Sequence, residues 1–325
     1  MSSLKESKLT LGKRKPQGKV DGNKLILVKR KTRLEELVTR FNTVEQARFY
    51  VERLGSDFTD YQNEDAVYKQ ALRAAEEALS EAGRLQVVSR EYVPNFIFGK
   101  QDIVVAVGQD GLVANTLKYL DNQPLIGVNP DPARWDGALL PFQVEDLRVL
   151  LTDVFAGRRP IAEVSMAKAT LNDGQALYAV NDLFIGQKTH VSARYHIQYD
   201  QACEYQSSSG IIVSTGLGAT GWLKSVVAGA AGITGAGDDI SVPAGREAWG
   251  SDYLHFTVRE PFPSRTTGAG IVFGRISEAR PMKITSYMPE NGVIFSDGVE
   301  SDFLEFRSGV SAEISVAEKK GRLVL

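Results

Sequence analysis

The order in which strand-like and helix-like segments follow one another constrains the fold of this 325-residue chain most strongly. From Lys24 to Ala156, short apolar runs of strand length alternate with segments of helical periodicity. Such alternation predicts a parallel sheet with helices on both faces, so the first half of the chain is predicted to be a doubly wound α/β domain. Its predicted strands are Leu25–Val28, Leu85–Ser89, Ile103–Val107 and Leu125–Val128, and its predicted helices begin near Leu34, cover Asp65–Ala82, follow Gly111 and cover Glu145–Ala156.

The part of the chain after Gly157 is dominated by predicted strands. Val191–Tyr199 alternates apolar and polar residues, as a half-solvated antiparallel strand does. Ser296-Asp297-Gly298 is predicted to be a turn, and Ala228–Asp239 a loop after a short helix that begins near Trp222. This half is therefore predicted to be a β-rich, sandwich-like domain. Its further predicted strands are Ile211–Val213, Leu254–Val258, Gly270–Phe273, Met282–Tyr287, Val293–Phe295, Ala312–Val316 and Arg322–Leu325.

Composition narrows the classes of partner and compartment. The formal net charge is −2, so neither nucleic acid nor an anionic membrane is predicted as the main partner. Cys203 is the only cysteine, which excludes an internal disulfide framework and predicts a reducing compartment: the cytoplasm or, in a eukaryote, the mitochondrial matrix. The three histidines lack metal-site spacing, and no metal site is predicted. Residues 1–23 are rich in Lys, Ser and Gly and are predicted to be a disordered basic tail.

A glycine-flanked aspartate follows the most apolar predicted strand. Gly108-Gln109-Asp110-Gly111 comes directly after Ile103–Val107, at the carboxyl edge where α/β sheets present their ligands. A glycine-rich corner that leads into a helix offers backbone N–H groups to phosphate, and Asp110 could accept the proton of a substrate hydroxyl. This arrangement suits phosphoryl transfer to an alcohol. The same residues also compose ordinary turns, so this motif alone does not decide between the two.

A second glycine motif lies in the β-rich half. Gly216–Gly221 has the G-x-G-x-x-G spacing, after a predicted strand and before a predicted helix. A dinucleotide-binding Rossmann unit would carry this motif near the start of a βαβ unit, with an acidic residue about 20 positions later at the end of a strand. Here Asp238-Asp239 follows a glycine-rich segment instead. A Rossmann oxidoreductase is therefore disfavoured.

Four motifs in order resemble those of the NAD kinase family. They are Gly108–Leu112, Gly127–Asn129, Asn181-Asp182 and Ser214–Trp222, and the resemblance covers nearly all of the chain from Lys24 onward. It is closest to the mitochondrial-type branch, through the segments Gly127–Pro132, Val180–Gly186, Ser208–Gly210 and Val258–Pro261. The resemblance implies an α/β nucleotide-binding domain over residues 24–143, a β-rich dinucleotide-binding domain over 144–325, and a cleft between them.

The family resemblance also implies an activity. A member of this family phosphorylates the 2′-hydroxyl of the adenosine ribose of NAD(H) with Mg-ATP, giving NADP(H), and is commonly a homodimer or larger homo-oligomer. Asp110 would contact that hydroxyl as base or orienting carboxylate, and Mg²⁺ would arrive with the triphosphate. Asn181 and Asp182 would hold the adenosine part, and Thr220 and Trp222 would line the dinucleotide pocket. The other residues implied in nucleotide binding are Gly108, Gly111, Asn129, Ser209 and Ser225.

Several positions depart from the family pattern. Gln109 stands in place of a glycine, and a side chain there would be unfavourable if that position required a positive φ. Leu112 stands in place of a threonine, so one hydroxyl that could bond to phosphate is missing. Asp182 replaces a glutamate, and Ser209 stands where many bacterial members have an aspartate. Two alternatives stay open: a catalytically degenerate nucleotide-binding protein, and a kinase that acts on another hydroxyl, such as that of a sugar or lipid.

The isolated residues have ordinary interpretations as well. Asn181-Asp182 by itself fits a turn, and Trp222 by itself fits a core position. The basic run Lys29, Arg30, Lys31 and Arg33 follows the first predicted strand, where it could attract a triphosphate, but such a run is also typical of a solvated loop. Only the joint order of the four motifs favours the enzymatic interpretation.

Overall fold

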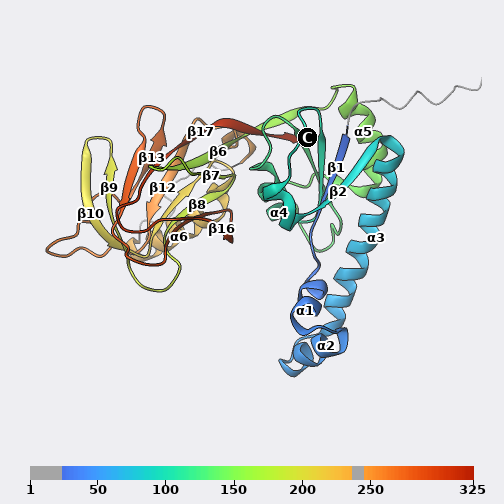
Figure 1. Cartoon of the computed structure of the whole chain (residues 1–325), viewed down its shortest axis with the longest axis horizontal. Helices are drawn as coiled ribbons and strands as arrows, with labels where there is room; N and C mark the ends of the chain where they lie inside the picture. The colour runs from blue at the N-terminus through green and yellow to red at the C-terminus, as the bar shows by residue number, and fades with distance from the viewer. Residues whose placement is uncertain (1–23, 236–244) are drawn as a thin grey trace, which may run out of the picture.

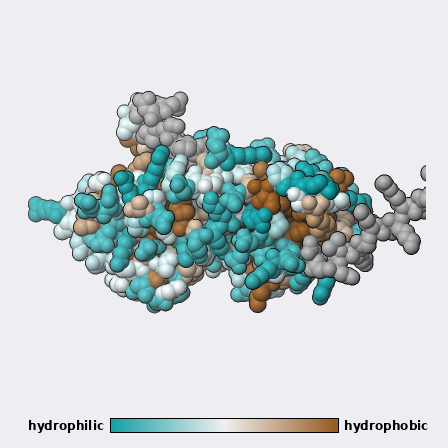
Figure 2. All heavy atoms as spheres, turned by 90° about the horizontal axis from the view of Figure 1, so that it is seen from above, coloured by the Kyte–Doolittle hydropathy of each residue, from teal (hydrophilic) through white to brown (hydrophobic). Residues whose placement is uncertain are grey.

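The computed structural model of the chain describes residues 24–235 and 245–325, and these form two lobes (Figure 1). The predicted basic tail, residues 1–23, and the end of the predicted loop, residues 236–239, lie outside the described residues. One lobe carries the parallel strands and most of the helices, and the other is built mainly of strands. Seen from above, the surface is mostly hydrophilic, and the larger hydrophobic areas lie over the helical lobe (Figure 2).

The first lobe contains a parallel sheet with the strand order β2-β1-β3-β4, and β5 pairs in parallel with β4. Helices α3 and α5 cover one face of this sheet and α4 covers the other, which confirms the predicted doubly wound α/β architecture. The strands are β1 (Lys24–Lys29), β2 (Arg84–Ser89), β3 (Ile103–Val107), β4 (Pro124–Asn129) and β5 (Phe142–Gln143), and the helices are α1 (Arg33–Phe41), α2 (Val44–Arg53), α3 (Phe58–Ala82), α4 (Asp110–Leu117) and α5 (Leu147–Phe155).

The alternation of side chains along β1 explains why both faces need a cover. Leu25 and Leu27 pack in one cluster with α3 and α5, whereas Ile26 and Val28 pack in another with α4. All four are fully buried, and burial of each such side chain stabilises the fold by about 1.5–3 kcal/mol. A strand that is apolar on both faces belongs in the middle of a sheet between two helical layers.

Helices α1 and α2 lie beside the far end of the long helix α3, away from the sheet (Figure 1). A capping box starts α1: the Thr32 hydroxyl accepts from the backbone N of Glu35, and the Glu35 carboxylate accepts from the backbone N of Thr32. Ala47 and Val51 of α2 pack against Phe58 at the start of α3 in a small separate core. This helical end is therefore held by its own contacts rather than by the sheet.

The second lobe is a sandwich of two sheets around one large apolar core, as the strand pattern predicted. One layer supplies Tyr195, Ile284 and Ile314 to this core, and the other supplies Ile185 and Phe256. The strands are β6 (Ile161–Leu171), β7 (Ala176–Ala179), β8 (Asp182–Gln187), β9 (Ala193–Tyr199), β10 (Ala202–Ser208), β11 (Ile211–Ser214), β12 (Tyr253–Val258), β13 (Phe273–Ser277), β14 (Met282–Ser286), β15 (Gly292–Ser296), β16 (Val299–Glu305) and β17 (Ser311–Val324), and the helix is α6 (Trp222–Thr234).

The C-terminal strand β17 connects the two lobes. It pairs antiparallel with β6, and its Arg322 and Leu323 pair in parallel with Pro124 and Leu125 of β4. The prediction of two separate strands over this region was wrong, because β17 is continuous from Ser311 to Val324 and absorbs an irregularity in its pairing with β6 as a bulge. A single sheet of 11 strands therefore runs through both lobes.

Two other predicted elements differ from the structure. The predicted loop after Ala228 is helical up to Thr234, because the alanines of α6 favour the helix more than Gly229 and Gly232 oppose it. The predicted strand at Gly270 begins only at Phe273, since the backbone N–H groups of Gly270 and Ile271 donate to the Glu204 carboxylate instead of a neighbouring strand. Within residues 24–235 and 245–325, no helix is both long and apolar enough to cross a bilayer.

Candidate active site

The turn between β3 and α4 has the geometry that the strand–glycine motif predicted. Gln109 precedes α4 with φ −109° and ψ 165°, which is ordinary extended backbone that a side chain tolerates. The backbone angles at this position therefore do not require a glycine, and Gln109 is not strained. Position 108, in contrast, favours glycine, because a Cβ there would lie 2.8 Å from Cδ2 of Leu112. Leu112 lies on the face of α4 that packs against the sheet and is buried there. The position where the family has a threonine is therefore part of the hydrophobic core.

Asp110 is the first residue of α4 and lies at the carboxyl edge of β3, where the sequence placed it. Its side chain is half-buried, and its Oδ1 accepts a hydrogen bond from the backbone N of Leu139 at 2.7 Å. The second motif holds the same loop: a Cβ on Gly127 would lie 2.0 Å from the carbonyl oxygen of Leu139. Asn129 donates from Nδ2 to the carbonyl of Trp135 at 2.8 Å. The first two motifs therefore position the loop over residues 130–140, and that loop fixes the Asp110 carboxylate.

The third and fourth motifs are joined directly by hydrogen bonds. The backbone N of Thr215 donates to the carbonyl of Asn181 at 2.9 Å, and the Thr215 hydroxyl donates to the carbonyl of Val180 at 2.5 Å. The Ser214 hydroxyl donates to the Asp182 carboxylate. Gly218 approaches so closely that a Cβ there would lie 2.2 Å from the carbonyl oxygen of Asn181. These contacts explain why the loop after β11 is rich in small residues.

Residues of the first and fourth motifs are buried in one apolar cluster, together with a residue that packs on the second motif and one that adjoins the third. Leu112 of α4, Leu139 of the loop after β4, Val180 before β8 and Leu217 after β11 are buried together in it. Two of these residues come from the α/β lobe and two from the β-rich lobe. The structure therefore brings together segments that are distant in the sequence, as a site between the lobes requires.

Asp297 organises the third motif, and the sequence indicated it only as a turn residue. Its carboxylate accepts from the backbone N of Asn181 at 2.6 Å, and also from the N–H groups of Val180 and Asp182. Its φ of 54° is an αL conformation, which aspartate tolerates better than most residues. Burial raises the pKa of Asp297 above its ordinary value, and the Lys118 charge opposes that shift. The sequence signal that could have indicated Asp297 is its position as a charged residue directly after the buried strand β15.

Asp182 is the most perturbed carboxyl of the motif residues. Burial raises its pKa to about 7, the hydrogen bond from Ser214 opposes the shift, and the nearby charge of Asp297 adds to it. A carboxyl with a pKa near 7 exists in both protonation states at physiological pH. Asp182 can therefore donate as well as accept hydrogen bonds there.

A buried lysine links the two lobes, and nothing in the sequence had indicated it. Lys118, at the end of α4, is almost inaccessible, and its Nζ donates to the Ser296 hydroxyl and to the Asp302 carboxylate, each at 2.8 Å. The hydroxyl of the adjacent Tyr119 donates to the same carboxylate, and burial together with this negative partner raises the tyrosine pKa. The helix that starts with Asp110 is thereby anchored to the strands on either side of Asp297.

A cavity of about 610 Å³ lies between the lobes at the end of the parallel strands. Gln109, Asn115 and Tyr119 line it from one lobe, and the segment from Val299 to Asp302 lines it from the other. Oδ1 of Asn115 is buried without a hydrogen-bond partner among the described residues. The cavity is also lined by the basic side chains of Arg30, Lys31, Arg33 and Arg90.

The basic run after β1 is mostly engaged in ion pairs rather than free in solvent. Arg30 pairs with Glu64 at 2.6 Å, Arg33 with Asp60 at 2.7 Å and Lys31 with Glu91 at 3.2 Å. The Asp60 carboxylate also pairs with Arg134, so two guanidinium groups lower the pKa of Asp60. These pairs orient the cations along the wall of the interlobe cavity.

A smaller cavity of about 300 Å³ lies in the β-rich lobe and brings Ser209 and Trp222 together. The Trp222 ring stacks on Phe184 with centroids 5.7 Å apart and an angle of 10° between the planes. The Arg259 guanidinium lies 5.5 Å from the centre of the Trp222 ring. Thr220 and Ser225 are exposed and do not line this cavity. Gly111, in the other lobe, is also exposed, and it has open space beside it at the start of α4.

Comparisons with known proteins agree on one fold. No protein-family model matches the chain. The NAD kinase of Chlorobaculum tepidum is 27% identical over 128 residues, which are 38% of this chain and 44% of that protein, so the chain spans less than half the length of this relative. The crystal structure of an NAD kinase from Archaeoglobus fulgidus in complex with ATP superposes with a TM-score of 0.56 at 17% identity and covers 93% of each chain. Yeast NADH kinase complexed with NADH superposes with a TM-score of 0.55 at 13% identity, over 93% of this chain and 83% of that one. The chain therefore has the fold of NAD and NADH kinases, with an N-terminal α/β lobe and a C-terminal β lobe.

Proposed function

We propose that this protein is an NAD(H) kinase that phosphorylates the 2′-hydroxyl of the adenosine ribose with Mg-ATP and gives NADP(H). The packing of the first and fourth motifs in one apolar cluster supports this proposal most strongly, together with the hydrogen bonds that join the third motif to the fourth and the cavity between the lobes. The sequence similarity to an NAD kinase and the shared fold support it independently. On its motifs, we assign the protein to the mitochondrial-type branch of the family and expect a homodimer or larger homo-oligomer.

Asp110 is the proposed group that acts on the acceptor hydroxyl. Its Oδ1 is held by the backbone N of Leu139 at 2.7 Å, so the carboxylate is oriented before substrate arrives. The 2′-oxygen attacks the γ-phosphorus, the bond from that phosphorus to the β,γ-bridging oxygen breaks, and the hydroxyl proton passes to the carboxylate. The products are ADP and the 2′-phosphorylated dinucleotide. Asn181 and Asp182, fixed by Asp297 and Ser214, are the proposed contacts for the adenosine part.

The triphosphate is assigned to the interlobe cavity. Arg30, Lys31, Arg33 and Arg90 line it and are the proposed donors to the polyphosphate oxygens. Three of them are also paired with carboxylates, Arg30 with Glu64, Lys31 with Glu91 and Arg33 with Asp60. Within residues 24–235 and 245–325, no three His, Cys, Asp or Glu side chains cluster as a metal cage would. Mg²⁺ is therefore expected to arrive bound to the triphosphate oxygens and to neutralise charge during transfer.

The decisive variant is Asp110→Asn, which keeps the shape of the side chain and removes its basicity. Protein, NAD and Mg-ATP are incubated, and product is detected with an NADP-specific dehydrogenase. The variant is expected to lose about 10²–10⁴ in kcat, with NAD binding by calorimetry nearly unchanged. Asp252→Asn, at an exposed position of the other lobe, is the matched control and should turn over like the parent. Equal turnover by Asp110→Asn and the parent would rule out the assigned role.

One observation favours a second candidate, a nucleotide-binding protein without turnover. Leu112 is buried in the core, so no hydroxyl is present where the family has its threonine. A parent protein that binds NAD in calorimetry but forms no NADP with Mg-ATP would support this second candidate. Product formation by the parent would exclude it.

A further inference from the structure

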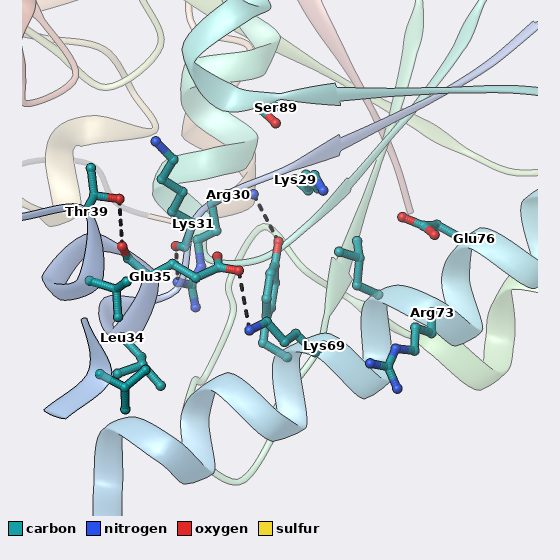
Figure 3. A pocket seen from close by; sticks show the side chains of 14 residues that line it. Lys29, Arg30, Lys31, Leu34, Glu35, Thr39, Lys69, Arg73, Glu76 and Ser89 are labelled. Atoms are coloured by element: carbon teal, nitrogen blue, oxygen red, sulfur yellow. Dashed lines mark hydrogen bonds and ion pairs between the residues drawn. The ribbon is translucent and has the colours of Figure 1, made fainter. Parts of the chain in front are cut away.

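A cavity of about 720 Å³ adjoins the interlobe cavity without belonging to the proposed active site (Figure 3). It lies between the end of β1 and the helices α1 and α3, and its volume is within the roughly 300–1,000 Å³ that is usual for small-molecule sites. The two cavities share Arg30, Lys31 and Ser89. None of the residues assigned above to NAD(H) or to phosphoryl transfer, apart from the shared basic run, lines this second cavity.

Basic side chains reach the second cavity from two elements. Lys29 comes from the end of β1 and Lys31 directly follows it, while Lys69 and Arg73 come from α3 (Figure 3). Lys69 is paired with Asp65 at 2.8 Å, and Lys31 with Glu91 at 3.2 Å. In the part of the chain that the structure describes, no carboxylate lies within ion-pair distance of Lys29 or Arg73. Glu35 and Glu76 also line the cavity, but neither is within ion-pair distance of Lys29 or Arg73, so these two positive charges are available to an anion.

The apolar part of the second cavity is aliphatic. Leu34 and Val38 of α1, Val44 at the start of α2 and Leu72 of α3 supply it. The aromatic ring that lines the cavity, Tyr68, is buried, covered by the Arg30 guanidinium at 4.7 Å and held by a hydrogen bond from its hydroxyl to the carbonyl of Val107. An aliphatic wall without a free aromatic face suits a hydrocarbon chain better than a nucleobase, which binds by stacking.

We propose that the second cavity binds an anion with an aliphatic chain, such as a fatty acid or an alkyl phosphate. The carboxylate or phosphate lies between Lys29 and Arg73, and the chain lies on Leu34, Val38 and Leu72. Such a chain reaches a protein either as a free molecule or within a bilayer. A recess between two helices and a strand favours the free molecule, because a bilayer lipid would require a flat surface.

The experiment titrates the full chain with monomeric decanoate by calorimetry and uses decanol as the uncharged analogue. The parent is expected to bind decanoate more tightly than decanol. A Lys29→Met/Arg73→Met variant should weaken decanoate binding about tenfold, because it removes two partly exposed ion contacts, and should leave decanol binding within about twofold. Arg84→Met, which removes an exposed cation of the same lobe outside the cavity, is the matched control and should bind like the parent.

A second variant, Leu34→Trp, fills the cavity without changing charge and should reduce the binding of both ligands. Equal decanoate affinity in the parent and the Lys29→Met/Arg73→Met variant would overturn the proposal. So would binding to phosphatidylglycerol vesicles without binding of monomeric decanoate, or displacement of decanoate by ADP. Kinase activity is not a readout here, so the outcome is independent of the proposed function.

Discussion

Single residues decide how the third and fourth motifs are held. Asp182 and Asp297 place two carboxyls in the interior beside the same backbone, where the Asp297 carboxylate accepts from three consecutive N–H groups. Burial raises the pKa of both, and that of Asp182 reaches about 7. Gly218 and Gly127 each lie so close to a carbonyl oxygen that a Cβ at either position would clash with it. At Gln109 the opposite holds, since extended backbone removes the need for a glycine.

The raised pKa of Asp182 gives stability a definite pH dependence. A group whose folded pKa lies above its unfolded value of 3.8 contributes stability that is complete below pH 3.8 and is lost as the pH rises through about 7. The Asp182→Asn variant should therefore gain stability relative to the parent across this window, by up to about 4 kcal/mol at roughly 1.4 kcal/mol per pKa unit. Urea unfolding at pH 4, 5.5 and 7.5 measures this difference. Parallel pH profiles of parent and variant would contradict it.

The close approach at Gly218 predicts a sharp contrast between two glycine substitutions. A Cβ at Gly218 would lie 2.2 Å from the Asn181 carbonyl oxygen, whereas one at Gly111 meets nothing within 4 Å. Gly218→Ala is expected to cost about 1–3 kcal/mol of unfolding free energy and to weaken NAD binding. Gly111→Ala, in the first turn of α4, should be neutral or stabilising by up to about 1 kcal/mol. Similar losses of unfolding free energy in both variants would show that the close approach at Gly218 does not cause the loss.

Among the elements, α4 connects the turn that carries Asp110 with the opposite lobe. It begins at Asp110 and is followed by Lys118, whose ammonium is buried against Ser296 and Asp302 of the β-rich lobe. The helical spacing of Val113, Leu117 and Leu120 predicted the helix, although every residue from Leu112 to Leu117 is buried. The same pattern gave no sign of Lys118, since a lysine next to an apolar run usually reaches solvent. Its partners are 178 and 184 residues away, a distance over which sequence pattern carries no information.

Removal of the Lys118 charge should therefore be costly. Lys118→Met leaves Asp302 without its buried partner, and the loss is expected to be about 2–3 kcal/mol, less than for a fully buried pair because Asp302 is 28% exposed. Lys320→Met removes a lysine that pairs with Glu163 at the surface and should cost less than about 0.5 kcal/mol. Chemical denaturation of both variants measures the contrast. Equal costs would mean that Lys118 does not stabilise the junction of the lobes.

For the molecule as a whole, the sequence predicted the architecture of each lobe better than the contacts that join the two lobes. Alternating strands and helices indicated the doubly wound lobe, and the strand-rich second half indicated the sandwich, because both depend on local periodicity. The pairing of β17 with β4 was not predictable, since it joins Arg322 to Pro124 across most of the chain. The site follows the same division. The motifs indicated Asp110 and Asp182, and the family resemblance implied a cleft between the lobes, whereas the role of Asp297 arises only from tertiary contacts.

The shared sheet makes a prediction about cooperativity. Because β17 pairs with strands of both lobes, the intact chain should unfold in one transition, with calorimetric and van't Hoff enthalpies in agreement. Deletion of residues 322–325 removes the pairing with β4 and should weaken the coupling of the lobes, so that the van't Hoff enthalpy falls below the calorimetric enthalpy, while Lys118 and the shared apolar cluster still join the lobes. A single unchanged transition after the deletion would show that the lobes are coupled elsewhere.

The position of the Asp110 carboxylate relative to bound NAD is the most direct test of the role proposed for Asp110. A crystal structure of the protein with NAD should place a carboxylate oxygen of Asp110 within about 2.6–3.2 Å of the 2′-oxygen of the adenosine ribose, with Asn181 and Asp182 on the adenosine part. An NAD molecule bound with this ribose out of reach of Asp110, or bound away from Asn181 and Asp182, would contradict it.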